Sequence, residues 1–432
     1  MQASVNEREL VLDMLLQITR DGEYSHIVIK NVLDKYQYLD KRERAFITRV
    51  VNGTLERMIE IDYIINLFSK VKVNKMKPLI RTILRSAVYQ MKYMDSVPDS
   101  AICNEAVKLA GKRGFVNLKG FVNGVLRNIS RNLDKINYPD EKDKVSYLSV
   151  KYSLPEWLVK QWLNVYDEET VKTIGSAFLE EKPLTVRFNE HKIKKEDLVG
   201  ILKKEGVTVG EVPEIPCALY LSGYDHLSAL PSFCEGLYQV QDLSSMQVAL
   251  WSEVKEGDQV LDVCAAPGGK SFTLAEQMNN TGRLIACDLH PHRVELIRSG
   301  ARRLHLDCIE SRVQDATLHS QDLPAADAIL CDVPCSGFGI LRRKPEIRYK
   351  DLDSIKDLPA LQLSILQTAA TYLKPGGRLV YSTCTLHKKE NEKVVSAFLD
   401  RHSAFFLAAE CTRFPCEQGS DGFYYAALER QA

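Results

Sequence analysis

The sequence lacks a long uninterrupted apolar run. Its first ten residues, MQASVNEREL, are polar and charged, and no later run approaches the roughly 20 apolar residues that a membrane-spanning helix needs. We therefore expect neither a signal peptide nor a membrane span, and we expect a cytoplasmic location.

Paired cysteines are also absent. The 11 cysteines are odd in number, extend from Cys103 to Cys416 and include no CxxC pair. This pattern fits neither a disulfide framework nor a zinc module, so most of these thiols are expected to be small buried hydrophobic groups. His290 and His292 form an HxH pair without a third ligand nearby in the sequence, and we expect no metal site.

Net charge is absent over the whole chain, with 57 lysines and arginines and 57 acidic residues, but the charge is unevenly distributed. Residues 1–150 contain 25 lysines and arginines against 18 acidic residues, which leaves a positive excess of seven. An excess of this size favours an anionic partner such as RNA only weakly, because a solvated helical surface explains it nearly as well.

The length of 432 residues exceeds one ordinary domain core, and the composition, 45% apolar and 26% charged, is typical of globular proteins. Up to about residue 133, apolar residues recur at helical spacing, as in Leu10, Met14 and Ile18. Beyond a polar stretch, strand-like runs at 184–188 and 218–222 flank a lysine-rich helix. We predict a helical domain over residues 1–140, a linker and small α/β subdomain over 141–235, and a larger α/β domain over 236–432.

From residue 236 onward, strand-like and helix-like segments alternate strictly. We predict strands at 259–263, 283–288, 308–313, 327–332 and 378–382, and helices after Gly269, at 292–304 and at 358–373. Strict alternation predicts a parallel, doubly wound, Rossmann-like sheet, which binds its ligands beyond the carboxyl ends of its strands.

The stretch LDVCAAPGGKS at 261–271 is a strand that runs into a small-residue turn and then a helix. Gly268 and Gly269 allow close backbone approach, and free N–H groups at the start of a helix bind an anionic group. A P-loop would need glycine where Cys264 stands, although DAILCD at 327–332 resembles a strand that ends in a magnesium-binding aspartate. A nucleotide hydrolase stays an alternative, whereas the GxGxxG motif of dinucleotide binding is absent.

S-adenosylmethionine fits this loop better. Its methionine carboxylate can lie on the glycine turn, and Asp288, at the end of the next strand, can bind the ribose hydroxyls. Asp315 follows the third strand, where an acid can accept a hydrogen bond from the adenine amino group, and Asp332 closes the fourth strand near the reacting sulfonium. The predicted cofactor-binding residues are Cys264, Ala265, Ala266, Pro267, Gly268, Gly269, Lys270, Asp288, Asp315 and Asp332.

Two cysteines follow predicted strand ends, Cys335 in DVPCSG and Cys384 in STCT. Carbon 5 of cytosine is a poor nucleophile, and addition of a thiolate to carbon 6 makes carbon 5 able to attack a methyl group. An ordinary cysteine has a pKa of about 8.5 and is mostly thiol at neutral pH. We expect the start of a helix near Lys388 to favour the thiolate of Cys384.

The motifs DVCAAPGGK, DVPCSGFGILRRKPEIRY and YSTCTLHKKENE closely resemble the signature motifs of RNA 5-methylcytosine methyltransferases, and VQDLSSMQVA and DGFYYAAL are in keeping with them. The resemblance implies that Cys384 is the nucleophile and that Cys335 assists release, and Asp332 completes the predicted catalytic set. Departures are small: threonine follows Cys384 where serine is commoner, Val333 stands where alanine is commoner, and DGFYYAAL has additional tyrosines.

The helical region is similar to NusB-type RNA-binding domains, on the stretches KRERAFITRVVNGTLER, AVYQMKYMDSVPDSAICNEAVKLAG and GFVNGVLRNISR. Its fusion to this catalytic domain is the mark of the RsmB (Sun/Fmu) family of 16S rRNA methyltransferases. The resemblance covers nearly the whole chain. It implies an enzyme that uses S-adenosylmethionine to methylate carbon 5 of a cytosine in 16S rRNA, free or partly assembled into the small subunit, and we expect a monomer.

A cytosine inside a helix is out of reach of a thiol, so the target must lie in a loop or swing out of its stack. Arg342, Arg343 and Lys344 directly follow the Cys335 motif and are expected to hold the flanking phosphates, although a solvated basic turn would have the same composition. Two alternatives stay open: a tRNA 5-methylcytosine methyltransferase, and a non-catalytic RNA-binding factor led by the helical domain.

Overall fold

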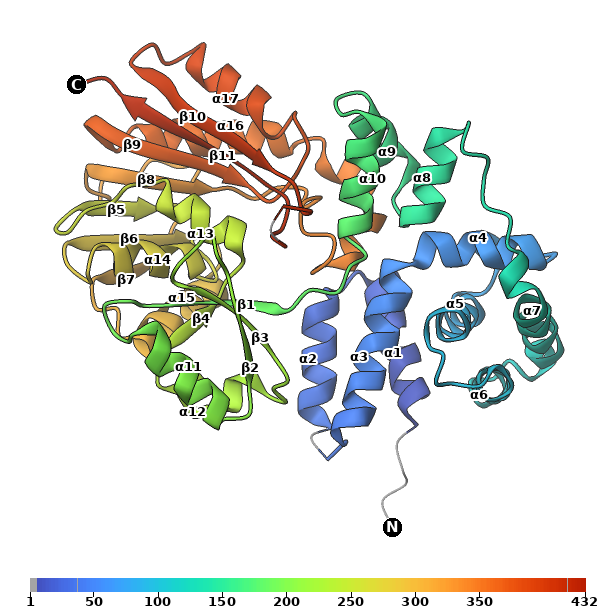
Figure 1. Cartoon of the computed structure of the whole chain (residues 1–432). Helices are drawn as coiled ribbons and strands as arrows, with labels where there is room; N and C mark the ends of the chain where they lie inside the picture. The colour runs from blue at the N-terminus through green and yellow to red at the C-terminus, as the bar shows by residue number, and fades with distance from the viewer. Residues whose placement is uncertain (1–5, 37, 418) are drawn as a thin grey trace. The chain divides into compact units, whose positions relative to one another are not determined.

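The computed structural model describes residues 6–36, 38–417 and 419–432. Internal contacts divide the chain into two compact units. The helical unit comprises Met1–Glu180 with Leu341–Lys350, and the sheet unit comprises Glu181–Ile340 with Asp351–Ala432. Figure 1 labels the helices and strands of each unit along the chain.

The helical unit is built from amphipathic helices around one apolar core. Asp40 and Glu43 form a capping box at the start of α3, and Pro78 occupies the first turn of α5. Leu10 and Met14, predicted as apolar-face residues, are buried in the core. The helices are α1 (Glu7–Asp21), α2 (Ser25–Lys35), α3 (Lys41–Glu56), α4 (Met58–Phe68), α5 (Pro78–Tyr93), α6 (Asp99–Lys112), α7 (Lys119–Asn132), α8 (Lys144–Tyr152), α9 (Glu156–Leu163) and α10 (Glu168–Ala177).

Helices α8 to α10 belong to the helical unit, whereas the sequence grouped the helix that begins near residue 154 with the small α/β subdomain. The reason is packing: α8 contacts α4 and α9, and α10 contacts α8 and α9. Leu158 and Trp162 of α9 are buried within this group.

A segment from much later in the sequence also joins the helical unit. Residues 341–350 contain the 3-10 helix η5 (Pro345–Tyr349). The fully buried Arg348 donates hydrogen bonds to the carbonyl oxygens of Leu341 (2.6 Å) and Phe178 (3.4 Å). The stretch DVPCSGFGILRRKPEIRY is therefore divided between the two units, with its cysteine in the sheet unit and its basic end in the helical unit.

The sheet unit begins with a small antiparallel sheet in the order β2-β3-β1-β4. The predicted strands at 184–188 and 218–222 are confirmed as β1 (Leu184–Phe188) and β3 (Ala218–Ser222), which pair directly. Helix α11 (Lys195–Lys204) contacts β2 and buries Leu198 and Leu202 in the core of this sheet. The remaining elements here are β2 (Thr208–Glu211), α12 (Pro231–Cys234) and β4 (Tyr238–Val240).

A larger sheet follows, in the order β10-β11-β9-β8-β5-β6-β7. The predicted Rossmann-like fold class is confirmed, and the strands from β5 to β9 run parallel. Its elements are α13 (Leu243–Leu250), β5 (Gln259–Asp262), α14 (Gly269–Gln277), β6 (Arg283–Asp288), α15 (Pro291–Leu304), β7 (Ile309–Val313), β8 (Ala326–Asp332), α16 (Leu358–Ala370), β9 (Leu373–Thr383), α17 (Glu392–Leu399), β10 (Phe405–Arg413) and β11 (Phe423–Arg430).

The predicted parallel arrangement is confirmed for β5 to β9, and the structure adds two strands that the sequence did not predict, of which β11 pairs antiparallel with both β9 and β10. The residues described between β10 and β11 form no helix, and the two strands pair directly as an antiparallel hairpin instead of being joined by a crossover. Mixed sheets of this kind, with antiparallel strands at the edge of a parallel sheet, are common.

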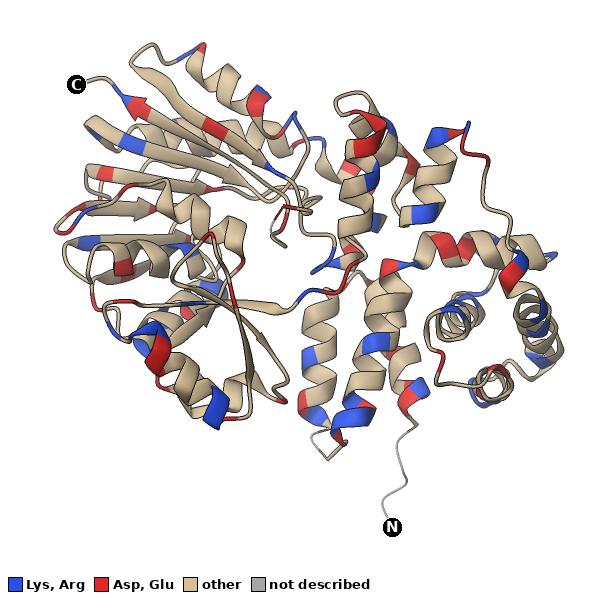
Figure 2. Ribbon diagram, viewed as in Figure 1, with Lys and Arg blue, Asp and Glu red and all other residues tan. Residues whose placement is uncertain are grey.

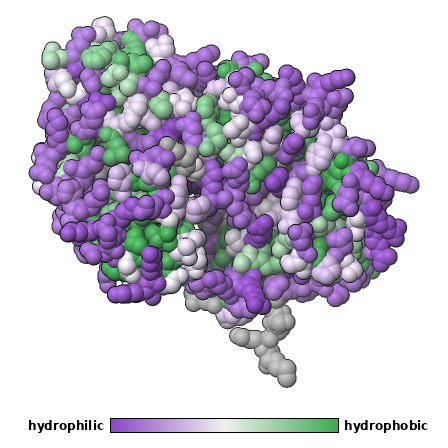
Figure 3. All heavy atoms as spheres, viewed as in Figure 1, coloured by the Kyte–Doolittle hydropathy of each residue, from purple (hydrophilic) through white to green (hydrophobic). Residues whose placement is uncertain are grey.

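Helices cover both faces of the larger sheet (Figure 1). Phe272 of α14 and Ile297 of α15 pack in one core cluster with one set of strand residues, while Ile365 of α16 and Phe398 of α17 pack in the cluster of the alternate set. This alternation follows from the two-residue period of a strand. The covered sheet fixes the carboxyl ends of β5, β6, β8 and β9 along one edge. The surface of the protein in the view of Figure 3 is mainly hydrophilic.

Candidate active site

The glycine turn after β5 has a backbone conformation and a packing environment that only glycine fits. Gly268 has a φ of 110°, and a Cβ there would collide with the ring of Phe272. Helix α14 begins at Gly269, so its first N–H groups lie at the end of this turn. The turn can therefore hold a carboxylate against the start of the helix, and the binding of the methionine carboxylate there stays a prediction.

Asp262, at the end of β5, lies beside this turn. Its Oδ2 accepts a hydrogen bond from Ser271 Oγ (2.6 Å), whereas its buried Oδ1 has no partner among the described residues. Burial raises the pKa of Asp262 to about 7. An unused buried acceptor next to an anion-binding turn suits a ligand that carries an ammonium group beside a carboxylate, as the methionine part of S-adenosylmethionine does.

Asp288, predicted to bind the ribose, reaches the same turn from the end of β6. Its carboxylate is almost fully buried, accepts hydrogen bonds from the N–H groups of Ala266 (3.3 Å) and His290 (3.2 Å), and lies 3.3 Å from Arg293. Asp315 instead accepts from the N–H and hydroxyl of Thr317 in its own turn (2.9 and 2.6 Å), and these hydrogen bonds lower its pKa. Its adenine contact stays a prediction.

Lys270 connects the cofactor turn to the end of β8. Its Nζ lies 2.7 Å from Asp332 Oδ2, and Asp332 Oδ1 accepts a hydrogen bond from Ser382 Oγ (2.7 Å). Burial acts to lower the pKa of Lys270, but attraction to Asp332, and more weakly to Cys384, raises it overall. The sequence placed Lys270 in the cofactor loop, and the structure adds this pairing with the predicted catalytic aspartate.

The two predicted thiols meet. Cys335 lies in the loop of residues 333–340 after β8, called the Cys335 loop, and Cys384 begins the loop of residues 384–391 after β9, called the Cys384 loop. Their sulfur atoms are 3.2 Å apart, and both residues are half-buried. The hydrogen bond with Cys384, together with burial, raises the pKa of Cys335 well above its ordinary value, so Cys335 remains a thiol at neutral pH.

The expected source of activation at Cys384 needs correction. Helix α17 begins at Glu392, not near Lys388, because Asn391 is still outside helical geometry. The Cys384 sulfur lies 3.2 Å from the Cys335 sulfur, and its charge is one of the groups that raise the pKa of Lys270. A thiol donor and a cation can stabilise negative charge on that sulfur.

Backbone contacts lock the thiol loops to a third motif. The N–H of Gly339 donates to the carbonyl of Cys384 (2.9 Å), and the N–H of Gly422 donates to the carbonyl of Gly339 (2.8 Å). A Cβ at Gly339 would collide with the carbonyl of Gly422, so only glycine fits. The stretch DGFYYAAL, noted in the sequence without a role, thus supports both cysteine loops.

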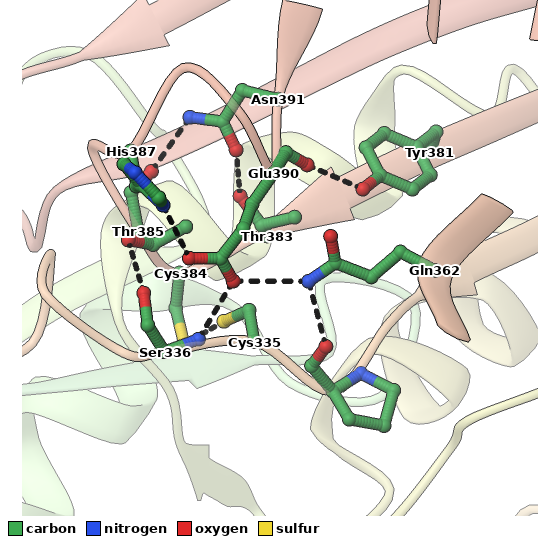
Figure 4. Close-up of polar contacts among 11 residues, drawn as sticks. Cys335, Ser336, Gln362, Tyr381, Thr383, Cys384, Thr385, His387, Glu390 and Asn391 are labelled. Atoms are coloured by element: carbon green, nitrogen blue, oxygen red, sulfur yellow. Dashed lines mark hydrogen bonds and ion pairs between the residues drawn. The ribbon is translucent and has the colours of Figure 1, made fainter. Parts of the chain in front are cut away.

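Sequence reasoning missed the polar network behind the thiols. In Figure 4, Glu390 lies at the centre of this network, where Gln362 reaches it from α16, and Asn391 lies at its upper edge. Glu390 and Asn391 are buried, although KKENE reads as a charged, exposed helix start. Their place inside the motif YSTCTLHKKENE was the available signal, but the partners of these side chains lie too far away in sequence to be inferred from it.

The predicted phosphate contacts lie in the helical unit. Arg343 is exposed, Arg342 and Lys344 are half-buried, and the Nζ of Lys344 is 5.5 Å from the ring centroid of Tyr24. Figure 2 shows further lysine and arginine positions along α7. The structure thus places Lys344 next to an exposed aromatic ring, an arrangement that nucleic-acid-binding surfaces use. The contact of Arg342, Arg343 and Lys344 with RNA stays a prediction.

A cavity of about 670 Å³ in the helical unit has no predicted role. Glu60, Lys92, Tyr93 and Tyr138 line it, but Tyr93 and Tyr138 donate to the Glu60 carboxylate, and Lys92 pairs with it at 2.9 Å. These four side chains therefore satisfy one another. Within the described ranges, no cluster of three or more potential ligand side chains could hold a metal ion, and no helix combines the length and apolarity of a membrane span.

Comparisons with known proteins agree with this geometry. Residues 249–429 match the family "16S rRNA methyltransferase RsmB/F", residues 5–131 match the NusB family, and residues 154–225 match the ferredoxin-like domain of RsmF/B-like methyltransferases. A Bacillus subtilis protein named as a probable ribosomal RNA small subunit methyltransferase B is 39% identical over 92% of this chain and 89% of its own length. A Synechocystis protein of the same name is 31% identical over 99% of this chain and all of its own length.

Solved structures show the same architecture. The crystal structure of PH0851 matches all of both chains with a TM-score of 0.83 at 25% identity. A methyltransferase homologue from Pyrococcus horikoshii covers 67% of this chain and 99% of its own with a TM-score of 0.60 at 27% identity. The predicted NusB-like domain and the S-adenosylmethionine cofactor are confirmed. The chain belongs to the RsmB (Sun) family of small-subunit ribosomal RNA methyltransferases.

Proposed function

We propose that this protein methylates carbon 5 of a cytosine in 16S rRNA, cytosine 967 by its resemblance to the family, through a covalent bond between Cys384 and carbon 6 of the ring. The observation that carries the proposal is the 3.2 Å contact between the sulfurs of Cys335 and Cys384 at neighbouring strand ends. Methylation at an amino or hydroxyl group would need neither thiol, whereas carbon 5 chemistry uses both.

The covalent cycle assigns a separate task to each thiol. The sulfur of Cys384 adds to carbon 6, which breaks the 5,6 double bond and makes carbon 5 nucleophilic. S-adenosylmethionine, when bound, would supply the electrophilic methyl group that carbon 5 attacks, its sulfur–methyl bond would break, and S-adenosylhomocysteine would leave. Loss of the carbon 5 proton then restores the double bond and expels the sulfur of Cys384, and Cys335, 3.2 Å from that sulfur, assists this release.

Asp332 is the carboxylate that we propose contacts the nitrogen edge of the cytosine ring. Its carboxylate is held between Lys270 (2.7 Å) and Ser382 (2.7 Å), at the end of β8 and directly before the Cys335 loop. These contacts fix its orientation, which is what a group that hydrogen-bonds a substrate ring must have. Lys270 pairs with Asp332 and is attracted to Cys384. Under this proposal its ammonium group stabilises negative charge on the Asp332 carboxylate and on the Cys384 sulfur.

The competing functions differ in what they leave unexplained. A non-catalytic RNA-binding factor would not need the buried Glu390 and Asn391 network that supports both thiols. A tRNA substrate is compatible with the thiol geometry but does not account for the NusB-type domain, whereas the Bacillus subtilis and Synechocystis relatives, which this chain matches over 89% and 100% of their length, are named for small-subunit rRNA. A nucleotide hydrolase is disfavoured by Cys264, where a P-loop has glycine.

Bisulfite sequencing of rRNA from cells without this protein tests the proposal. We expect cytosine 967 of 16S rRNA to become fully convertible, and complementation to restore its protection. If 16S rRNA stayed protected and a cytosine in tRNA became convertible instead, the substrate of this protein would be tRNA and not 16S rRNA. The reaction takes place in the cytoplasm under this proposal, since its substrate is there.

Replacing Asp288 with alanine should weaken cofactor binding by about tenfold to a hundredfold, because hydrogen bonds from ligand hydroxyls to a charged acceptor contribute about 1.5–3 kcal/mol. Isothermal calorimetry with S-adenosylmethionine measures the dissociation constant. Asp307→Ala, at an exposed position outside the turn, is the matched control and should leave it unchanged. Equal constants for both variants would remove Asp288 from the cofactor site.

RNA binding should weaken steeply with salt, because contacts to phosphates release bound counterions. Replacing Arg342, Arg343 and Lys344 together with glutamine should reduce the slope of log affinity against log salt by roughly 2–3, about one per lost phosphate contact. Lys255→Gln, an exposed lysine just before β5, is the control. A wild-type slope in the triple variant would exclude these residues as phosphate contacts.

A further inference from the structure

Two adjacent buried residues, Glu390 and Asn391, lie behind the thiol pair (Figure 4). Neither side chain belongs to the predicted catalytic or cofactor-binding set. A buried carboxylate is costly unless hydrogen bonds compensate its lost hydration, so the partners of Glu390 indicate what it is there to hold.

Glu390 holds the Cys335 loop. Its Oε2 accepts hydrogen bonds from the N–H of Ser336 (2.8 Å) and from Nε2 of Gln362 (3.0 Å), and Gln362 Nε2 also donates to the carbonyl of Pro334 (2.9 Å). The peptide groups on both sides of Cys335 are thereby fixed. The backbone of Cys335 has little freedom to move while this arrangement stands.

The charge state of Glu390 supports this role. Burial acts to raise its pKa, but hydrogen bonds from His387 (Nδ1 to Oε1, 2.9 Å), Ser336 and Gln362 outweigh burial and lower it. The group is thus a carboxylate, whose hydrogen bonds are stronger than those of a neutral acceptor. The hydroxyl of Tyr381 also donates to the backbone carbonyl of Glu390 (2.5 Å), which fixes the residue itself.

Asn391 holds Cys384 in the corresponding way. Its Oδ1 accepts a hydrogen bond from Thr383 Oγ1 (2.6 Å), and its Nδ2 donates to the carbonyl of Thr385 (2.9 Å). These are the residues immediately before and after Cys384. Glu390 therefore fixes the backbone on both sides of Cys335, and Asn391 fixes the backbone on both sides of Cys384. Because the two residues are consecutive, the peptide bond between them sets the distance between these two sets of hydrogen bonds.

We propose that Glu390 and Asn391 are separate positioning residues for the two thiols, Glu390 for release through Cys335 and Asn391 for attack through Cys384. This inference rests on the proposed covalent mechanism. Loss of the Glu390 contacts should slow release of the adduct and leave its formation close to normal. Loss of the Asn391 contacts should slow formation and leave release close to normal. A displacement of about 1 Å at a reacting group can cost on the order of a hundredfold in rate, so each effect is large enough to measure.

The test measures adduct formation and adduct release separately, by rapid quench with labelled rRNA fragment and S-adenosylmethionine. Glu390→Ala should release the adduct at least about tenfold more slowly than wild type, so that covalent protein–RNA complex accumulates, while the single-turnover rate of methyl transfer changes by less than about threefold. Asn391→Ala should form the adduct at least about tenfold more slowly, without accumulation.

Control variants separate positioning from loss of stability. Asp327→Ala removes a carboxylate that accepts hydrogen bonds from Gln259 N–H (2.9 Å) and Lys374 (2.8 Å) at the opposite end of β8, and should lower the unfolding midpoint without changing either rate of the folded enzyme. Glu390→Gln retains one oxygen acceptor and should restore release toward the wild-type rate. Gln362→Ala, which frees Pro334, should slow release as Glu390→Ala does.

The outcomes distinguish failure of the positioning roles from failure of the covalent mechanism on which they rest. If Cys335→Ala accumulates the adduct but neither Glu390→Ala nor Gln362→Ala does, the positioning roles are wrong and the mechanism stands. If Glu390→Ala fails to fold, Gln362→Ala decides: wild-type release in that variant overturns the inference. Absence of an adduct in wild type and in Cys335→Ala alike would instead reject the covalent mechanism itself.

Discussion

Cys384→Ala should abolish methyl transfer, lowering the single-turnover rate by a factor on the order of 10⁴ or more, as expected for loss of a covalent nucleophile. Without sulfur at this position nothing can add to carbon 6, and carbon 5 stays a poor nucleophile. The rate is measured as transfer of labelled methyl to an rRNA fragment under excess enzyme. Covalent protein–RNA complex should also disappear from denaturing gels.

Cofactor binding serves as the control for this variant. Cys384 lies in the loop after β9, whereas the cofactor turn follows β5, so the dissociation constant for S-adenosylmethionine should stay within about twofold of wild type. Methyl transfer at more than a tenth of the wild-type rate in a folded, cofactor-binding Cys384→Ala would contradict the assigned nucleophile.

Cys335→Ala should produce the opposite gel result, a stable covalent complex with RNA. Attack by Cys384 does not need the second sulfur as a nucleophile, but release loses the group that lies 3.2 Å from the bonded sulfur. We expect turnover to fall by about 10²–10⁴, the range for loss of a general acid or base. Denaturing electrophoresis with labelled RNA measures the trapped fraction.

The double variant fixes the order of events. Cys335→Ala combined with Cys384→Ala should form no covalent complex, because attack precedes release. A complex that forms in Cys384→Ala and is lost in Cys335→Ala would reverse the two roles. The same reversal would exchange the expected phenotypes of Glu390 and Asn391.

Local pattern was enough to predict much of the sheet. The run RLIACD at 283–288 became β6 with the same bounds, since its residues are apolar on both faces and a glycine precedes it. Asp288 and Asp332 close β6 and β8 as predicted, because the carboxyl ends of parallel strands share one edge. The spacing of apolar residues predicts each strand, and the place of the strand in the repeating βα pattern predicts where its last residue lies.

Features that depend on distant partners were not predictable. The antiparallel pairing of β11 with β9 depends on a sheet edge that only the folded domain creates. Residues 341–350 join the helical unit through contacts such as Arg348 with Phe178, 170 residues apart in sequence. Lys270 pairs with Asp332 across 62 residues, so a lysine of the cofactor loop became part of the thiol site.

The correction at Cys384 has a simple local cause. Charged residues after the cysteine indicated a helix from about Lys388, but the side chain of Asn391 bonds to the residues flanking Cys384 and keeps its own backbone outside the helix. Asparagine competes with helical hydrogen bonds in this way. Helix α17 therefore starts at Glu392 instead of near Lys388.

The central claim, a bond between one sulfur and a pyrimidine ring, is tested most directly by peptide mass spectrometry of the enzyme trapped on rRNA fragment that contains 5-fluorocytosine. Fluorine replaces the carbon 5 proton whose loss permits release, so the adduct should persist. The account predicts a nucleotide mass on the peptide that contains Cys384, with the Cys335 peptide unmodified. A modified Cys335 peptide, or methyl transfer to cytosine with no modified cysteine at all, would contradict it.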